Sequence, residues 1–510
     1  MEISMEQMQA DKILETGILL AAERNYDELL SKIVDCAMDL TQSDGGTLYL
    51  YEEEQLKFCI MKNASLKVNR KGVDGEQYPP VAMNEKNVCA YSAIHRRLLN
   101  IEDVYSCEEF DFSGPREYDK MTGYHTKSVL VFPLVNHEGN LVGVVQLINA
   151  QNEAGEVVPY KKEYEKVLKS LGSQAAVAVS NMRYVQEMEQ LMFSITQVFT
   201  DAIDTRIPYN YFHSRNVYLY VKMMANHMNK KYWEGKCKYF FTAAEQNELE
   251  MSALMHDIGK MVIPNEIINK TTRLDTGISL VLERFDHLKA LSRIDCLEGR
   301  IGQEEWLEAK ERFAEAKKRV EEIDQKPNLD EDDIAYINGL SAMVYTDEEG
   351  GQIPYLTPEE TECLTVKQGN LTPEERGVIC SHVTYTEKYL SAMNFGKRYP
   401  HIIEWAGAHH EYLDGSGYPR GLKGDEVPFE ARILTIVDVF EALTSADRPY
   451  KKSMDAEKAF SVLEDMAAHN KIDKELLGLF KEAFFENRHK LHLFGKDGEP
   501  FQADAGRNGD

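Results

Sequence analysis

Seven histidine and aspartate residues are the part of this sequence best suited to binding metal. His256 and Asp257 are adjacent in MSALMHDIGK. Neighbouring residues on a helix point only about 100° apart, so both side chains can reach one cluster of ions. The remaining five lie in FHSRNV, CSHVTY, GAHHEY and TIVDVF, and they are His213, His382, His409, His410 and Asp438. Each segment reads as a helix with an inward apolar stripe, and polar groups aimed at a core need a partner, which metal can supply.

Any one of these histidines could instead be a core or surface residue bonded to a carbonyl. The prediction of a metal site therefore rests on the set. The other nine histidines do not stand in comparable segments with further candidate ligands and are interpreted as structural: His95, His125, His137, His227, His287, His401, His469, His489 and His492. Because His409 and His410 would diverge on an intact helix, we expect that helix to end there, at the following DGSG.

Bound metal can promote hydrolysis, because it lowers the pKa of a bound water, and such a reaction needs no Ser or Cys nucleophile. In DGSGYPRG, Gly415 and Gly417 allow a close approach of backbone to a ligand, Pro419 stiffens the loop, and Tyr418 offers a ring or a hydroxyl. The alternative for this segment is an ordinary turn that ends a helix.

The elements that must position these residues divide into two regions of different periodicity. An apolar pattern of helical spacing precedes four strands, GTLYLYEE, LKFCIMK, SVLVFPLVN and NLVGVVQLINA, which predicts an α+β domain with an antiparallel sheet. Beyond Pro208 the chain reads as helical nearly to its end. We expect an N-terminal domain over 1–185, a connecting helix over 160–205, an all-α domain over 195–490 and a tail over 491–510 with little to bury. Within the all-α domain we expect a helical insert over 271–366, in which a charged helical hairpin is followed by an acidic loop.

The connecting segment reads as one helix from Tyr160 to about Asp204, without a Pro or a Gly pair to stop it. A helix of that length leaving a small domain often packs against a copy of itself, which predicts a homodimer. The alternative is two consecutive helices with an unrecognised break.

The C-terminal segments MHDIGKMVIP, HHEYLDGSGYPRGLKGDEVPFEARILTIVDVFEALTSADRPYKK and NLTPEE resemble the HD-GYP family, the HD-superfamily phosphodiesterases of cyclic di-GMP. The resemblance covers about residues 195–490 without the insert. It implies two divalent ions, most often Fe or Mn, held by the seven residues above, with Asp257 bridging them. It also implies catalytic roles for Asp257 and Lys260, and substrate contacts from Gly417, Tyr418, Pro419, Arg448 and Lys451.

Two departures from that family bear on function. Where some members place a Glu for a third ion, this chain has Tyr209, and the nearest upstream acid is Asp204. We therefore expect two ions and a linear dinucleotide product. The insert separates IPNEIINK from KQGNLTPEE, and it could be a lid, a docking arm or a surface hairpin without function.

The segment LLNIEDVYSCEEFDFSGPREYDKMTGYHTKSVLVFPLVNHEGNLVGVVQLINA resembles the GAF modules of cyclic-nucleotide phosphodiesterases. Of the Asn-Lys-Phe-Asp-Glu signature found in modules that bind cyclic nucleotides, Asn149 and Glu165 remain, while Ala150, Tyr160 and Tyr164 replace the rest. This half-lost signature argues against a cyclic nucleotide. It leaves another small ligand, or a GAF domain that only dimerises.

Charge and composition disfavour some classes of binding partner and indicate a cellular location. With 58 Lys+Arg against 85 Asp+Glu the net charge is −27, which disfavours duplex nucleic acid and anionic membrane surfaces. The 8 cysteines are dispersed and read as reduced thiols, and no segment resembles a signal peptide or a membrane span, so we expect a cytoplasmic protein.

Together these features predict a GAF-regulated, metal-dependent phosphodiesterase that converts a cyclic dinucleotide, cyclic di-GMP first, to the linear form pGpG. One alternative is a protein that binds the dinucleotide and signals with weak or no turnover. Another is a phosphodiesterase for a different cyclic nucleotide, such as cyclic GMP-AMP.

Overall fold

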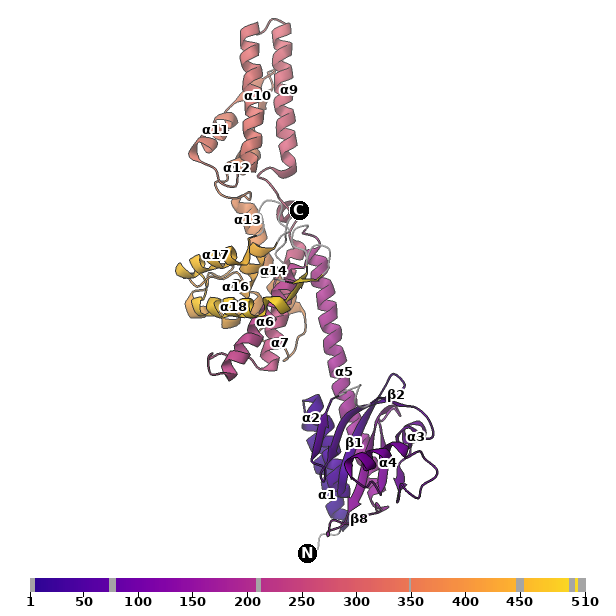
Figure 1. Cartoon of the computed structure of the whole chain (residues 1–510). Coiled ribbons are helices and arrows are strands. Elements are labelled where there is room, and N and C mark those ends of the chain that lie inside the picture. The colour runs from indigo at the N-terminus through magenta and orange to yellow at the C-terminus, as the bar shows by residue number, and fades with distance from the viewer. Residues whose placement is uncertain are drawn as a thin grey trace. The chain divides into compact units, whose positions relative to one another are not determined.

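The computed structural model describes residues 5–72, 79–207, 212–347, 350–445, 454–494 and 500–502. The chain divides into two compact units, Met1–Met192 and Phe193–Asp510 (Figure 1). Within the described residues, no helix is both long and apolar enough to cross a membrane.

The first unit is built on an antiparallel sheet, as predicted. The sheet order is β3-β2-β1-β7-β6-β5, with β4 paired to β2 and β8 to β7. The strands are β1 Ser43–Glu52, β2 Gln55–Asn63, β3 Val68–Lys71, β4 Val81–Ala82, β5 Leu99–Ile101, β6 Val129–Val135, β7 Leu141–Gln151 and β8 Val157–Val158. The helices before α5 are α1 Met5–Ala22, α2 Tyr26–Thr41, α3 Val88–His95 and α4 Ser113–Thr122.

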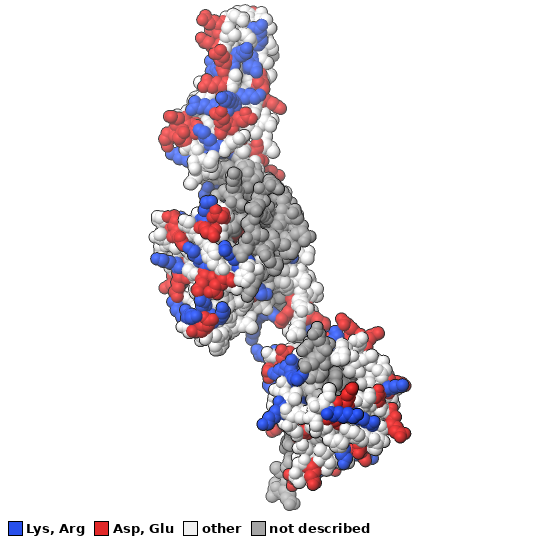
Figure 2. Space-filling view, viewed as in Figure 1, with Lys and Arg blue, Asp and Glu red and all other residues white. Residues whose placement is uncertain are grey.

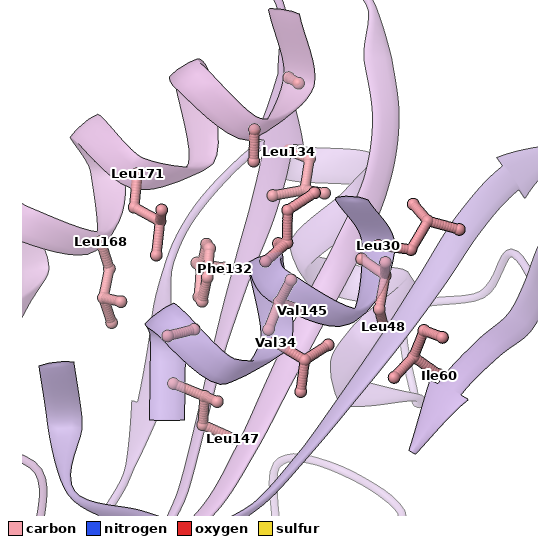
Figure 3. Packing of buried hydrophobic residues seen from close by; sticks show 14 of the residues in the cluster. Leu30, Val34, Leu48, Ile60, Phe132, Leu134, Val145, Leu147, Leu168 and Leu171 are labelled. Atoms are coloured by element: carbon pink, nitrogen blue, oxygen red, sulfur yellow. The ribbon is translucent and has the colours of Figure 1, made fainter. Parts of the chain in front are cut away.

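Alternation along β6 fills two cores, one on each face of the sheet. Leu130 and Phe132 belong to the cluster formed with α2 and α5, whereas Val129 and Val131 belong to the cluster formed with α3. Figure 3 shows the first cluster, where Leu168 and Leu171 of α5 point toward Phe132.

Helix α5 runs unbroken from Tyr164 to Asp204 over 41 residues. The prediction of one continuous helix is therefore confirmed, and the alternative of two helices with a break is wrong. Its last turns belong to the second unit, where Thr200, Ile203 and Asp204 are buried.

The second unit is helical. Its elements outside the insert are α6 His213–Trp233, α7 Ala243–Met255, η1 Ile258–Val262, α8 Asn265–Ile268, α13 Pro373–Cys380, α14 His382–Ala392, α15 Ile402–Ala406, η3 Gly424–Glu426, α16 Phe429–Thr444, α17 Ala456–Ala468, α18 Lys474–Asn487 and η4 Arg488–Lys490, and the insert begins with η2 Asp275–Gly277. Aromatic rings join α6, α16 and α18, with Tyr220 edge-on to Phe440 and Phe480. Within the predicted tail, β11 His492–Phe494 pairs with β12 Pro500–Gln502, and Leu493 is buried.

The insert has a hydrophobic core of its own. Helices α9 Ile278–Leu297 and α10 Gln303–Gln325 pack side by side (Figure 1). The segment expected to be an acidic loop instead forms α11 Glu331–Ser341, strands β9 Val344–Thr346 and β10 Gln352–Pro354, and α12 Pro358–Leu364. The reason is local: Asp330 and Thr357 each close a capping box, which uses acidic residues to start a helix. Figure 2 shows charges of both signs interspersed over this part of the chain.

The base of the insert is fastened by one buried arginine. Arg273 is 1% exposed and donates to the backbone oxygens of Ile323 at 3.0 Å and Val366 at 3.1 Å. The two ends of the insert are therefore joined through a single guanidinium group.

Candidate metal centre

The seven predicted site residues come together in the second unit, mostly at helix ends. His213 and His382 are the first residues of α6 and α14, and His256 and Asp257 lie between α7 and η1. His409 and His410 follow the end of α15, as predicted from the DGSG that comes after them, and Asp438 lies within α16. The expectation that all of them lie inside helices is wrong, because side chains from separate elements converge more readily at junctions than along one helix.

Asp257 is at the middle of the group. Its Oδ1 is 3.2 Å from His382 Nε2 and 3.9 Å from His409 Nε2. Its Oδ2 is 3.2 Å from His256 Nε2 and 3.6 Å from His213 Nε2. The two oxygens of one carboxylate thus face two different pairs of imidazoles.

Asp438 completes one side of the group. Its Oδ1 is 3.1 Å from His213 Nε2, and its Oδ2 is 3.9 Å from His410 Nδ1. Three sets of side chains have ligand atoms within 4.8 Å of one another, namely His213 with His256 and Asp438, His256 with Asp257 and His409, and His382 with His409 and His410. These sets overlap and include all seven residues.

Three imidazoles are fixed with one nitrogen directed into the centre. The Nδ1–H groups of His256, His382 and His409 donate to carbonyls three residues earlier, at 2.6, 2.7 and 2.6 Å. Their Nε2 atoms, and Asp257 Oδ1, are buried and have no hydrogen-bond partner among the residues that the structure describes. Orphaned acceptors of this kind are costly in a protein interior, and a cation satisfies them. The donor set, imidazole with carboxylate, fits a borderline divalent metal.

The protonation states of the candidate ligands differ across the centre. Burial lowers the pKa of His410 to about 4 and holds the pKa of His409 well below its usual value, so both rings are neutral. Burial opposes ionisation of Asp257, but Lys260 and His256 keep its pKa well below the usual range. Burial would also lower the pKa of His256, yet Asp257 outweighs it and raises that pKa to about 9. A cation beside Asp257 would compete with that proton.

Two buried glutamates support the site, and neither was predicted from the sequence. Glu441, one turn after Asp438 on α16, contacts His213 Nδ1 with one carboxylate oxygen, which orients that ring. Glu411 directly follows the histidine pair and is 1% exposed. The one sequence feature that could have indicated Glu441 is that a carboxylate stands there among apolar residues of a helix.

Close packing holds the two halves of the centre together. Gly259 N–H donates to Thr386 Oγ1 at 3.0 Å, and Thr386 Oγ1–H donates to the carbonyl of His256 at 2.9 Å. A Cβ placed on Gly259 would lie 1.9 Å from the carbonyl oxygen of His382. Glycine is therefore required where η1 meets α14.

The last turn of α5 contacts both sides of the centre. Asp204 is 1% exposed and accepts the backbone N–H of Ser214, next to His213, at 2.9 Å. Arg206, just beyond the helix, donates to the carbonyls of Met261 and Ile263, past Lys260. The connecting helix thus ends on the segments that carry the predicted site residues.

Of the other predicted site residues, some lie beside the centre and some fall outside the described residues. Lys260 Nζ donates to Asp257 Oδ2. The Tyr418 ring lies 4.8 Å from that of His410, with Gly417 and Pro419 on either side of it in the chain. Tyr209, Arg448 and Lys451 lie outside the described residues.

In the first unit, the side chains of Asn149, which remains from the GAF signature, and Tyr160, which replaces a signature residue, make structural hydrogen bonds. Asn149 Nδ2 donates to the His125 carbonyl at 2.8 Å, and Asn149 Oδ1 accepts from Lys127 N at 2.7 Å. Tyr160 is buried, with its hydroxyl 2.9 Å from Ser43 Oγ. A separate cavity of about 820 Å³ lies at the edge strand β5, beside Lys169 of α5.

Comparison with known families divides the chain into a GAF region and an HD region. Residues 25–179 match the GAF domain, and residues 210–324 and 355–476 each match an HD domain model. The first HD match contains His213, His256 and Asp257, and the second contains the other four site residues. Because all seven meet in one centre, the two matches describe one HD domain. These matches confirm the resemblance to GAF and HD-superfamily proteins.

Relatives with assigned activities match a limited part of the chain. It is 42% identical over 117 residues to 3'3'-cGAMP-specific phosphodiesterase 3 of Vibrio cholerae serotype O1, covering 23% of this chain and 24% of that protein. It is 36% identical over 131 residues to a cyclic di-GMP phosphodiesterase of Thermotoga maritima, covering 23% and 34%. The chain therefore spans about a quarter to a third of the length of these relatives. A solved GAF domain from Acinetobacter phosphoenolpyruvate-protein phosphotransferase covers 35% of this chain and 98% of its own, with 15% identity and a TM-score of 0.27.

Proposed function

We propose that this chain, a GAF domain followed by an HD domain, is a metal-dependent phosphodiesterase that hydrolyses a cyclic dinucleotide, cyclic di-GMP first, to the linear form. The observation that carries the proposal is the set of buried, unpartnered nitrogens of His256, His382 and His409 around Asp257. A protein that only binds a nucleotide has no chemical need for such a set.

We further propose two divalent ions, Fe or Mn, held by His213, His256, Asp257, His382, His409, His410 and Asp438. The opposed directions of the two Asp257 oxygens support a bridging role for that carboxylate. Such a pair would lower the pKa of a water between the ions and neutralise the oxygens of the scissile phosphate.

The chain's own groups would then bind and orient the substrate. Lys260 lies against Asp257, so its ammonium group is within reach of a phosphate at the centre and stabilises charge on the phosphoryl oxygens. The Tyr418 ring lies 4.8 Å from the His410 ring and is the proposed contact for a base. As the resemblance implies, Arg448 and Lys451 are the proposed contacts for phosphate.

A second substrate is favoured by a specific observation. The relatives that match at 41–42% identity over about 120 residues are named as 3'3'-cGAMP-specific phosphodiesterases. Cyclic GMP-AMP is therefore the alternative substrate, and both dinucleotides belong in the same assay.

The test combines metal content with product identity. Protein purified without oxygen should contain two Fe or Mn ions per chain and convert cyclic di-GMP to pGpG. Asp257→Asn and His256→Ala should lose both metal and turnover while keeping their helical circular dichroism. As a matched control, His469→Ala removes a histidine whose side chain is 68% exposed and should change neither. Near-wild-type hydrolysis by a metal-free Asp257→Asn protein would refute the proposal, and dinucleotide binding without turnover by metal-loaded protein would favour the signalling alternative.

We also propose that the protein is a homodimer joined along α5. Tyr184, Met188, Leu191, Ile195 and Val198 are 52%, 65%, 55%, 57% and 70% exposed, at alternating spacings of four and three residues. That is the a/d pattern by which two identical helices pack. Phe193 lies off this pattern and packs against Tyr218 of α6 within the second unit.

Sedimentation measurements test this proposed dimer interface along α5. Leu191→Glu with Ile195→Glu should shift the protein to monomer, whereas Gln190→Glu, an exposed change on the same helix outside the pattern, should leave the dimer intact. A small ligand in the GAF domain would act through this helix by shifting the population of its arrangements.

A further inference from the structure

The loop that contains Tyr418 is folded around one buried carboxylate. Glu411 Oε1 accepts the backbone N–H of Arg420 at 2.7 Å, and Oε2 accepts that of Leu422 at 2.9 Å. Both oxygens are thus used by the segment that follows Tyr418 and Pro419. Charged hydrogen bonds of this kind, made in a residue that is 1% exposed, are strong and directional.

The same loop is attached to the metal-binding segment by its backbone. Tyr418 N–H donates to the carbonyl of His410 at 3.1 Å. A Cβ on Gly417 would lie 2.5 Å from that carbonyl oxygen and 2.4 Å from Tyr412 N. The backbone of the loop at Gly417 is therefore in direct contact with the backbone that follows His410. The Tyr418 ring lies 4.8 Å from the His410 ring and 6.4 Å from the His382 ring.

We propose that Glu411 is a positioning residue that fixes Tyr418 over the metal centre and so sets the geometry of the dinucleotide, without touching either the ions or the substrate. This inference rests on the proposed function and deepens it. Glu411 directly follows His410, so the segment that supplies a metal ligand also supplies the group that shapes the substrate loop. Loss of the carboxylate should therefore impair recognition of the large substrate and leave the ions in place.

Glu411→Gln is the informative substitution, because it keeps the volume while leaving only one oxygen to accept two backbone donors. We expect kcat/KM for cyclic di-GMP to fall by about 10- to 100-fold, mainly through a higher KM. Metal content should equal that of the wild type. Hydrolysis of bis(p-nitrophenyl) phosphate, a small diester that requires the ions but is too short to use the loop, should change less than about twofold. Trypsin should cleave faster after Arg420, since its N–H is no longer held.

Glu426→Gln is the matched control. Glu426 is an exposed glutamate of the same region that accepts one backbone N–H, from Lys423 at 2.9 Å, and its loss should leave all four measurements unchanged. Glu411→Asp keeps the charge and should recover part of the lost kcat/KM. Parallel loss of metal and of both activities in Glu411→Gln would overturn the proposal, as would an unchanged KM for cyclic di-GMP. A wild-type protein that cleaves the small diester but no cyclic dinucleotide would instead refute the proposed function.

Discussion

Replacing Gly259 by alanine should break the metal centre without touching any proposed ligand. The added Cβ would lie 1.9 Å from the His382 carbonyl oxygen and 2.5 Å from Thr386 N. Because such contacts are not made below about 3 Å, η1 and α14 must separate by about 1 Å, and the hydrogen bonds that join them through Thr386 lengthen. Overpacking of this kind costs about 1–3 kcal/mol of folding free energy.

The effect on metal should be larger than the effect on folding. Binding constellations tolerate displacements of about 0.5 Å, and the shift would move His382 away from His256 and Asp257. We expect the midpoint of urea unfolding to fall and metal affinity, measured by competition with a chelator, to drop by at least about tenfold.

Gly478→Ala supplies the control for this experiment. Gly478 lies in α18 with no atom within 4 Å of an added Cβ, so alanine should be neutral or stabilise the helix by up to about 1 kcal/mol. If Gly259→Ala binds metal with wild-type affinity and unfolds at the wild-type midpoint, the close contact does not hold the centre together and the reasoning is refuted.

Three further outcomes follow from the site. Lys260→Ala should lower turnover by about 100-fold while elemental analysis finds the metal retained, because the ammonium group stabilises phosphate oxygens; metal loss would make Lys260 part of the ligand set. Glu441→Gln should weaken metal binding by about 10- to 100-fold in a chelator titration, since His213 Nδ1 loses its anionic partner; unchanged affinity would contradict that role. In a time course, linear dinucleotide should accumulate, because the two proposed ions would leave the linear product poorly positioned for a second cut, and mononucleotide formed without this intermediate would argue for a third ion.

The seven candidate ligands, which the structure brings together, could be proposed from the sequence, whereas the residues that support them could not. Each candidate ligand could be found locally, as a polar residue in an apolar helical pattern, and His409 with His410 even located a helix end. Glu441 could not be assigned, because its partner His213 is 228 positions away and nothing near Glu441 in the chain indicates that contact. The same holds for Gly259, whose requirement for glycine comes from the backbone of a distant helix.

Periodicity predicted the longer strands and helices because a long element contains enough residues to show its repeat. Strands β1, β2, β6 and β7 alternate over many residues and were found, whereas β5, with three residues, has too little sequence to show a pattern. The region before α12 was predicted to be an acidic loop, which is wrong because Asp330 and Asp333 form the capping box that starts α11, and Glu360 forms one with Thr357 at the start of α12.

The contacts of Asp204 and Arg206 at the end of α5 have a consequence for how sensor domains can be exchanged. The end of the helix is held at Ser214 and Met261, and a residue added upstream in the helix rotates whatever precedes it by about 100° about the helix axis relative to that end. Seven added residues bring this rotation to within about 20° of two full turns. A foreign sensor grafted onto this helix should therefore work only at insertion lengths that keep the phase of the heptad, so the permitted fusions recur with a period along the chain.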